Sequence, residues 1–554
     1  MAFSLKKDSV EFIFNSPLET LDDFYIWENA GEVPCPEIKK GDRILLPVDE
    51  GMVLKADGDY FHPDFDFQSF EFPFCRREAT MNMIIIERDK KFLLIALSDG
   101  KNSSYKCQKI NGLYSLSINN KKSVITYYKI FDNLISACKF YKSLKKAPAT
   151  LLEKKNSLPE IEKLIGGAKF WIFDDNYDEV MYSKENTEVT AHVGDNLLKV
   201  AKELKEGGVD RALIGIFFEP DNKYSEPLYK DFSYISTQYD NYNDVLNEGI
   251  LQFIPSNRIR NCDYTARRAK DYPDGIGVNE NGEQKRAWGV FGFDGKEHFL
   301  YHLCAKVAKK RIAEEVPEII KKYPYFKGRF LDCFGTGLEE CFNPLHPLTR
   351  EESADIKRDA FKILFDMGLI TGTEDGMEEV LDYLVYSEGM HSPDLFRNAN
   401  SGRRQAHIFN DYEKTNTEKY MLNPSLRVPL WQMVYHECLI PFSYWGDSTD
   451  ACIEQIDKKI LFACLFGCPP LYSFKVGNFE KLKEAILYSY KKITPIHSKI
   501  ATLPMTDYEV LSEDYMLQTS VFGEKYRVVA NFSNEDREYN GKTIGALDLL
   551  FEEI

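Results

Sequence analysis

The sequence predicts an α/β protein: a central (β/α)8 barrel of the TIM type, flanked by an N-terminal β-sandwich and a small C-terminal β-sandwich. From Gly166 onward, apolar strand-like runs alternate with amphipathic helical segments, which is typical of a parallel barrel. On both sides of that region, short strands separated by Gly, Asp and Asn indicate β-sandwiches. A length of 554 residues suits about three domains.

The N-terminal β-sandwich is predicted over residues 1–132. We expect its strands at Val10–Phe14, Arg43–Pro47, Met83–Glu87, Phe92–Leu97 and Val124–Tyr128. Residues 133–165 are expected to form a helical linker that ends near Pro159, because apolar side chains recur at helical spacing at Leu134, Ala137, Phe140 and Leu144.

The barrel is predicted over residues 166–475. Eight candidate strands match the eight positions of the fold: Ala168–Phe173, Ala212–Phe217, Leu251–Pro255, Arg329–Phe334, Leu369–Glu374, Tyr383–Ser387, Val428–Tyr435 and Ile460–Leu465. The long interval from Asn257 to Tyr325 contains an insertion, Arg267 to Trp288. Barrel enzymes keep such loops at the catalytic mouth, so we expect this insertion to shape the pocket.

Residues 476–554 are predicted to hold a helix and the C-terminal sandwich. The helix is expected at Phe479–Thr494, and the strands at Tyr515–Thr519, Tyr526–Asn531 and Gly545–Leu550.

Composition excludes several classes of partner. The net charge is −17 and the basic residues are scattered, so nucleic acid is not an expected partner. The N-terminus has no continuous apolar run of a signal peptide, and no segment is long and apolar enough to span a membrane, so we expect a cytoplasmic protein. The twelve Cys show no CxxC pair, which favours free buried thiols over disulfides or a metal site; no metal and no cofactor are expected.

Two candidate strands end in carboxylates. Asp332 follows Arg329-Phe330-Leu331, and Glu374 follows Leu369 to Thr373, with a helical segment between them. Consecutive parallel strands of a barrel would bring both carboxylates to its mouth. Glycosidases use a pair of carboxylates at this place for catalysis. The position at a strand end, taken alone, is equally consistent with a structural carboxylate that caps the next helix.

The surrounding residues resemble a known family. After Asp332 come Glu339-Glu340-Cys341-Phe342-Asn343-Pro344-Leu345-His346-Pro347-Leu348-Thr349-Arg350, then Thr373-Glu374-Asp375-Gly376, Tyr386-Ser387-Glu388-Gly389-Met390, and Arg427 to Glu437. This run is similar to the catalytic domain of glycoside hydrolase family 129, the exo-α-N-acetylgalactosaminidases related to the family 101 endo-enzymes. The resemblance implies a retaining mechanism, with Asp332 as nucleophile and Glu374 as acid/base. Glu437 stands where the family pattern is expected to hold Asp. The longer side chain there puts the identity of the substrate sugar in doubt, but not the reaction type.

Further polar and aromatic residues are candidate substrate-binding groups. Glu388 ends a candidate strand and competes with Glu374 for the acid role, although a contact with a sugar hydroxyl or a helix terminus is favoured. His436 and Glu437 close an apolar strand, where unpartnered polar groups are expensive to bury, so they are expected to bind the sugar, with a hydrogen-bonded core histidine as the alternative. The remaining candidates at the mouth are Asp174, Trp288, Trp445 and Asp447.

These observations predict an exo-acting α-glycosidase for a terminal α-linked N-acetylgalactosamine or galactose. An α-galactosidase-type enzyme acting on another sugar is the nearest alternative. From a different class, a non-catalytic carbohydrate-binding protein on a decayed barrel stays open, and the two carboxylates argue against it.

Overall fold

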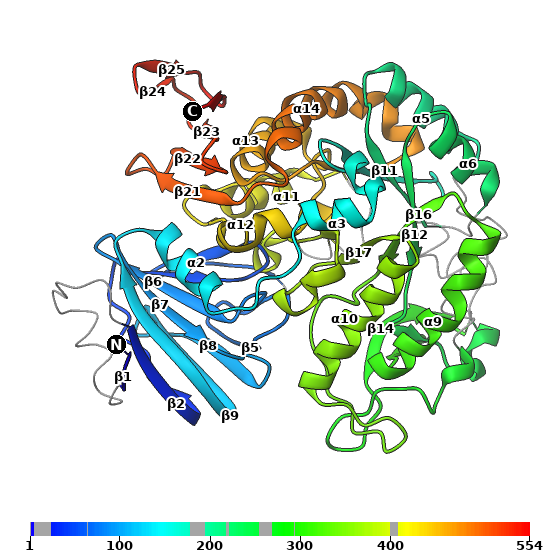
Figure 1. Ribbon diagram of the computed structural model, residues 1–554, viewed down its shortest axis with the longest axis horizontal. Helices are drawn as coiled ribbons and strands as arrows, with labels where there is room; N and C mark the ends of the chain where they lie inside the picture. Colours follow the sequence, from blue (N-terminus) through cyan, green and yellow to red (C-terminus); the bar gives the residue numbers. More distant parts are fainter. Residues whose placement is uncertain are drawn as a thin grey trace.

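The computed structural model describes residues 2–4, 24–63, 65–177, 194–217, 221–253, 269–292, 294–398, 401 and 408–554. A barrel with its helices occupies one side of the molecule, and the N- and C-terminal sheets lie on the other side, one below the other in Figure 1. The expected strand Val10–Phe14 and the start of the expected insertion, residues 267 and 268, lie outside the described residues. In the described part of the chain, no helix combines the length and the apolar character that crossing a membrane requires.

The central sheet confirms the predicted barrel. Its eight strands are parallel and follow one another around the ring in chain order, and β20 pairs with β10. Among the described residues β19 and β20 are not paired, so the ring is nearly closed. The strands are β10 (Ala168–Phe173), β11 (Ala212–Ile216), β12 (Ile235–Asp240), β16 (Phe326–Leu331), β17 (Ile370–Glu374), β18 (Tyr386–Glu388), β19 (Ile440–Phe442) and β20 (Leu471–Lys475).

Side chains alternate across the barrel wall. On β10, Phe170 and Ile172 face outward and pack in the core formed with the surrounding helices, whereas Trp171 and Phe173 belong to the core inside the barrel. Glycines make room for the large interior rings. A Cβ on Gly372 would lie 2.0 Å from the Tyr386 ring.

Helices cover the outside of the barrel (Figure 1). They are α5 (Asn196–Glu206), α6 (Asn222–Lys230), α9 (Ala305–Lys322), α10 (Arg350–Asp366), α13 (Ile456–Phe466) and α14 (Phe479–Ile500). Helix α10 begins with a capping box, because Thr349 accepts from the backbone N–H of Glu352 and the Glu352 side chain accepts from that of Thr349. This cap fixes where the loop after β16 ends.

Three of the eight predicted strands are wrong. Residues 248–253 form a short 3-10 helix, with 254 and 255 outside the described residues; Leu430–Tyr435 is helix α12; and Ile456–Phe466 is helix α13. Every residue of α12 is buried, and a short run that is apolar on all faces has no periodicity to distinguish a helix from a strand. The strands that take these places are β12, β19 and β20.

The N-terminal part is one nine-stranded sheet, antiparallel except for the β1–β2 pair. Its longest strand, β9, pairs with β8 along its first part and with β7 along its last part, and β2 runs along it. The strands are β1 (Ala2–Ser4), β2 (Phe24–Val33), β3 (Arg43–Leu46), β4 (Met52–Lys55), β5 (Ser69–Pro73), β6 (Met83–Arg88), β7 (Lys91–Leu97), β8 (Ser103–Ile110) and β9 (Leu113–Phe131). Helices α2 (Leu134–Ser143) and α3 (Leu151–Ser157) then lead to the barrel.

The C-terminal part is a four-stranded antiparallel sheet with a two-stranded ribbon. The sheet has the order β21 (Met505–Val510), β22 (Leu517–Phe522), β23 (Tyr526–Asn531) and β26 (Leu549–Glu553), and the ribbon consists of β24 (Arg537–Tyr539) and β25 (Lys542–Ile544). One continuous hydrophobic core joins residues of both terminal sheets with α10, α12 and α13, so the sheets are packed on the barrel.

Candidate active site

Asp332 lies directly after β16 at the mouth of the barrel and is 8% exposed. Its backbone N–H donates to the carbonyl of Asp240 on β12 at 2.9 Å, which extends the strand pairing and fixes its position. The Tyr239 hydroxyl donates to its Oδ2 at 2.6 Å. The other oxygen, Oδ1, is buried and has no hydrogen-bond partner within normal distance among the described residues.

Glu374 is the last residue of the neighbouring strand β17 and is 4% exposed. A carboxylate oxygen of Glu374, one of Asp332 and the Cys333 sulfur all lie within 4.8 Å of one another. The Cys333 thiol donates to Glu374 Oε2 at 3.4 Å, and Arg77 Nη1 lies 3.9 Å from Oε1. The structure therefore brings together the two carboxylates that the sequence singled out.

Burial and the neighbouring carboxylate perturb the pKa of Asp332. Burial, and next the charge of Glu374, raise the pKa of Asp332 well above its usual range, and the Tyr239 hydroxyl acts in the opposite direction. Two buried carboxylates this close repel each other when both are ionised, which favours the protonated form of Asp332. One ionised and one protonated carboxyl group is the state that acid-assisted nucleophilic chemistry requires.

Trp288 reaches the same mouth from the insertion, on β14 (Arg286–Phe291). Its indole N–H donates to Asp244 Oδ2 at 2.7 Å, and the side chain is 43% exposed. Asn241 donates to the same carboxylate oxygen at 2.8 Å. Asp244 is close enough for its charge to raise the pKa of Asp332. A half-exposed indole held beside the carboxylates can offer its face to a sugar ring.

Arg397 is the centre of a second buried cluster at the mouth. It donates to Asp375 at 3.2 Å and to Asp394 at 2.9 Å, and its nitrogens lie 3.7 Å from Asp49 and 3.5 Å from Asp447. Burial raises the pKa of Asp375 to about 7 and that of Asp447 to about 6, although Arg397 lowers both. Groups at the mouth therefore titrate close to neutral pH.

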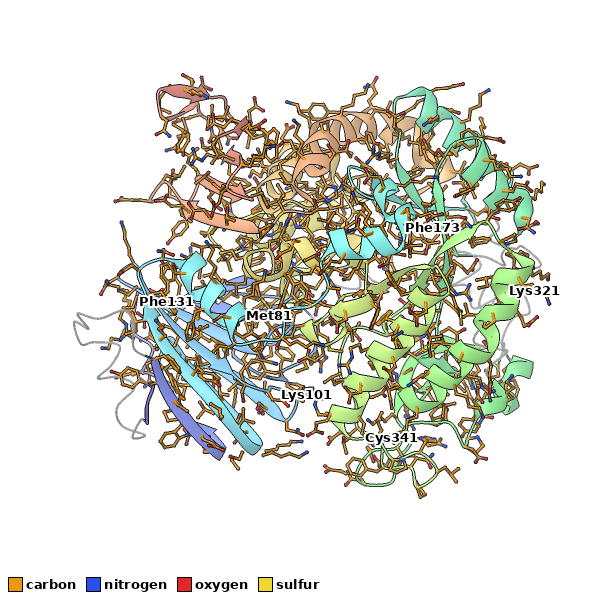
Figure 2. The ribbon with its side chains drawn as sticks, in the orientation of Figure 1. Met81, Lys101, Phe131, Phe173, Lys321 and Cys341 are labelled. Carbon is orange, nitrogen blue, oxygen red and sulfur yellow. The ribbon has the colours of Figure 1, made fainter. Side chains whose placement is uncertain are left out.

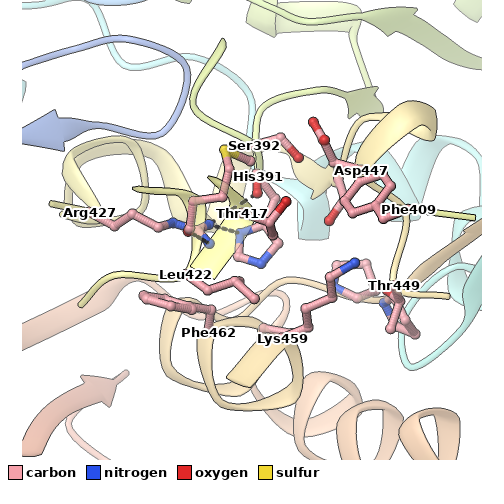
Figure 3. A pocket seen from close by; sticks show the side chains of 15 residues that line it. His391, Ser392, Phe409, Thr417, Leu422, Arg427, Asp447, Thr449, Lys459 and Phe462 are labelled. Atoms are coloured by element: carbon pink, nitrogen blue, oxygen red, sulfur yellow. Dashed lines mark hydrogen bonds between the residues drawn. The ribbon is translucent and has the colours of Figure 1, made fainter. Parts of the chain in front are cut away.

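Asp447 also lines a cavity beside this cluster (Figure 3). Arg427 and Asp447 lie on opposite sides of the cavity in that view, and Arg427 donates to the His391 carbonyl at 3.0 Å. Phe409, Thr449 and Lys459 are among the other lining residues. Of the candidate residues from the sequence, Asp447 is the one that faces this cavity.

Glu388 lies inside the barrel in a buried ion pair. Its Oε1 is 2.8 Å from Lys169 Nζ, and its Oε2 accepts from the Trp171 indole N–H at 2.8 Å; Lys169 and Glu388 are both fully buried. Both oxygens are thus engaged by the barrel interior. Trp445 packs edge-on against Trp171 and at a tilt against Phe330, and it is 6% exposed, so it belongs to the same interior core.

His436 and Glu437 do not close a strand, which corrects the premise of their predicted sugar-binding role. They follow helix α12, and the His436 ring nitrogens lie 2.7 Å from the Leu503 carbonyl and 3.2 Å from the Gly467 carbonyl. Glu437 forms an ion pair with Lys142 on α2. The partners of both side chains lie where α2 and the C-terminal segments pack against the barrel. None of these partners belongs to the group around Asp332.

Asp174 follows β10 and closes a turn, since it accepts from the backbone N–H of Asn176 at 2.9 Å.

Sequence reasoning did not identify four residues at the barrel mouth: Tyr239, Asp244, Arg77 and Arg397. Tyr239 and Asp244 belong to the third barrel strand, β12, and the loop after it. The third strand was predicted at Leu251–Pro255 instead, so neither residue was considered. Arg77 comes from the turn between β5 and β6, far from the barrel in the chain, and no sequence signal marks it.

Comparison with known proteins bears on the family. Solved structures of similar fold include α-N-acetylgalactosaminidase NagBb from Bifidobacterium bifidum, ligand-free, with a TM-score of 0.65 at 16% identity over 91% of this chain and 82% of that chain. Its GalNAc complex gives 0.63 at 16% identity over 94% and 82%. The GH36 α-galactosidase AgaA from Geobacillus stearothermophilus gives 0.50 at 10% identity over 96% and 75%. At these identities the likeness establishes the fold alone.

No curated protein sequence matches this chain. The family model for glycosyl hydrolases related to the GH101 family, GH129, matches residues 203–521. That span is more than half of the chain and contains Asp332, Glu374 and their strands. The protein therefore belongs to the glycosyl hydrolases related to the GH101 family, GH129, and is a glycoside hydrolase.

Proposed function

We propose that this glycoside hydrolase is a retaining, exo-acting α-glycosidase that releases a terminal α-linked N-acetylgalactosamine. The observation that carries the proposal is the close approach of the two carboxylates: one oxygen of each lies within 4.8 Å of the other at the ends of neighbouring strands. Retaining enzymes hold their carboxyl groups about 5–5.5 Å apart, whereas inverting enzymes leave roughly 6.5–9.5 Å for a water molecule. The short separation supports double displacement.

In this proposal Asp332 is the nucleophile. Its Oδ1 attacks the anomeric carbon, while Tyr239 holds Oδ2 and disperses its charge. Glu374 donates a proton to the leaving oxygen, and then takes a proton from the water that hydrolyses the glycosyl-enzyme. Arg77, 3.9 Å from Glu374, offsets the negative charge that Glu374 carries after its proton has left.

The sugar is proposed from the named neighbours. NagBb is an α-N-acetylgalactosaminidase with a solved GalNAc complex, and AgaA is an α-galactosidase of the same overall fold, so galactose is the second candidate. A non-catalytic carbohydrate-binding role does not explain why the two carboxylates are kept at reacting distance.

A panel of aryl glycosides tests the proposal. We expect release of the aryl group from α-N-acetylgalactosaminide, weaker or no release from α-galactoside, and an α-configured sugar as the first product by proton NMR. A β-configured first product would contradict the retaining mechanism. A folded protein that cleaves no α-glycoside of the panel would contradict the proposed activity.

A further inference from the structure

Two cysteines and one histidine converge outside the catalytic cluster. Cys304 directly precedes helix α9, and Cys341 and His346 lie in the loop between β16 and α10, where Figure 2 labels Cys341. The two Sγ atoms and a ring nitrogen of His346 all lie within 4.8 Å of one another. Cys304 is fully buried, Cys341 is 2% exposed, and His346 is half-buried. None of the three contacts Asp332 or Glu374.

The histidine ring is held in the orientation of a ligand. Its Nε2 lies 2.7 Å from the backbone carbonyl of Asp274. A carbonyl only accepts, so Nε2 carries the proton and Nδ1 presents its lone pair. That lone pair faces Cys341 Sγ at 3.5 Å. Metal-binding histidines are typically fixed in this way, with the second nitrogen bonded to a carbonyl or carboxylate.

The three donors are held in place by backbone contacts of their own loops. Cys341 and Leu348 exchange two backbone hydrogen bonds, of 2.8 and 2.9 Å. The Asn343 amide donates to the carbonyls of Asp274 and Ile276, and Cys304 N–H donates to the Gly275 carbonyl. The donors therefore converge in a site whose backbone is already arranged.

The spacing fits zinc. Zn–S bonds of about 2.3 Å and Zn–N bonds of about 2.0–2.1 Å in a tetrahedron place neighbouring donors roughly 3.5–3.8 Å apart. The distance of 3.5 Å between Cys341 Sγ and His346 Nδ1 already has this value. The other two donor pairs, within 4.8 Å, need to close by about 1 Å at most. Thiolate and imidazole donors favour zinc, whereas calcium and magnesium prefer oxygen.

We propose that Cys304, Cys341 and His346 form a zinc-binding site with three protein ligands and water in the fourth position. Zinc there joins the start of α9 to the loop that runs from Asp332 to α10. Both thiols lose their protons on binding, and these protons pass to solvent. The site is independent of the proposed glycosidase activity, because it uses none of the residues at the barrel mouth.

Zinc content and cobalt spectra test the site in the full-length protein. We expect one equivalent of zinc by elemental analysis, and a thiolate-to-metal charge-transfer band with tetrahedral d–d bands after replacement of zinc by cobalt. Cys304→Ser, Cys341→Ser and His346→Gln should each weaken zinc binding by roughly 10-fold or more in competition with a chromophoric chelator. Cys452→Ser is the matched control, since Cys452 is equally buried but lies outside the group. It should bind zinc as the unmodified protein does.

Circular dichroism establishes that each variant is folded, and His346→Gln, at the half-buried position, serves if a cysteine variant does not fold. Absence of bound zinc and of the charge-transfer band in the unmodified protein would overturn the proposal. So would unchanged affinity in the folded variants. If mild oxidation instead joins Cys304 and Cys341 in a disulfide and no zinc binds, the pair is a dithiol and not a metal site.

Discussion

Replacing Asp332 by Asn tests the chemistry and the electrostatics of the barrel mouth together. The two side chains are nearly isosteric, and the Tyr239 hydroxyl can donate to the amide oxygen as it does to Oδ2. The variant should fold, but it has no carboxylate to attack the anomeric carbon. We expect turnover to fall by several orders of magnitude, equivalent to about 5 kcal/mol or more in the barrier.

The same substitution should stabilise the protein at neutral pH. The closest oxygens of Asp332 and Glu374 lie within 4.8 Å of each other, and two unit charges at that limiting distance would repel by about 3 kcal/mol at an effective dielectric constant of about 20. Because the folded pKa of Asp332 is raised above its unfolded value, the native state loses stability as pH rises from the unfolded pKa through the folded one. Asn has no proton to lose in that window, so the variant should gain up to about 3 kcal/mol at neutral pH, and the gain should fade in acid.

Two measurements separate the effects. Turnover of an aryl glycoside reports on the chemistry, and the melting temperature, measured by calorimetry from acidic to neutral pH, reports on the stability. Asp355→Asn on α10 is the control, because the Asp355 side chain is 66% exposed and should change neither quantity appreciably. Near-normal turnover by folded Asp332→Asn would refute the nucleophile assignment. A melting curve whose pH dependence matches that of the unmodified protein would refute the repulsion argument.

Three further substitutions separate the roles of the neighbouring residues. Glu374→Ala should lose activity on glycosides with poor leaving groups, keep some on activated aryl glycosides and recover with azide; this pattern in Glu388→Ala instead would reverse the assignment. Tyr239→Phe removes the 2.6 Å hydrogen bond that lowers the pKa of Asp332. We expect kcat/KM to fall roughly 10- to 100-fold and the acidic limb of its pH profile to move to higher pH. An acidic limb at the same pH as in the unmodified protein would contradict this role of Tyr239. Lys169→Met leaves Glu388 buried without its cation and should cost roughly 3–5 kcal/mol of folding free energy by denaturant titration, and an unchanged midpoint would show that the pair is dispensable.

Much of the barrel could be predicted from the sequence because its clearest strands are apolar runs bounded by turns. β10 and β11 are of this kind, and all of their residues are buried. β12 reads Ile-Ser-Thr-Gln-Tyr-Asp, and of these residues Ile235 and Tyr239 belong to the hydrophobic core inside the barrel, so the strand lacked a continuous apolar signal. The strand that carries Tyr239, and with it the hydrogen bond to Asp332, was therefore missed.

The two carboxylates were predictable because they stand at strand ends, a position that topology brings to one place. The zinc ligands were not, because Cys304 and Cys341 come from different loops and share no short motif. His436 and Glu437 were assigned to the site on a strand that is in fact helix α12, and a helix directs consecutive side chains to different neighbours than a strand does.

The contribution of the N-terminal sheet to the barrel mouth could not be deduced from sequence spacing. Its turn between β5 and β6 pairs with the loop after Asp332, since the Arg77 N–H donates to the Thr336 carbonyl at 2.9 Å and the Leu338 N–H to the Cys75 carbonyl at 3.1 Å. That pairing places the Arg77 guanidinium beside Glu374 and 3.6 Å from Asp375. Removing the sheet would leave a crowded set of buried carboxylates with one guanidinium fewer, and the mouth would then favour protonated carboxyl groups over the ionised nucleophile. The sheet therefore completes the electrostatics of the barrel in addition to covering its side.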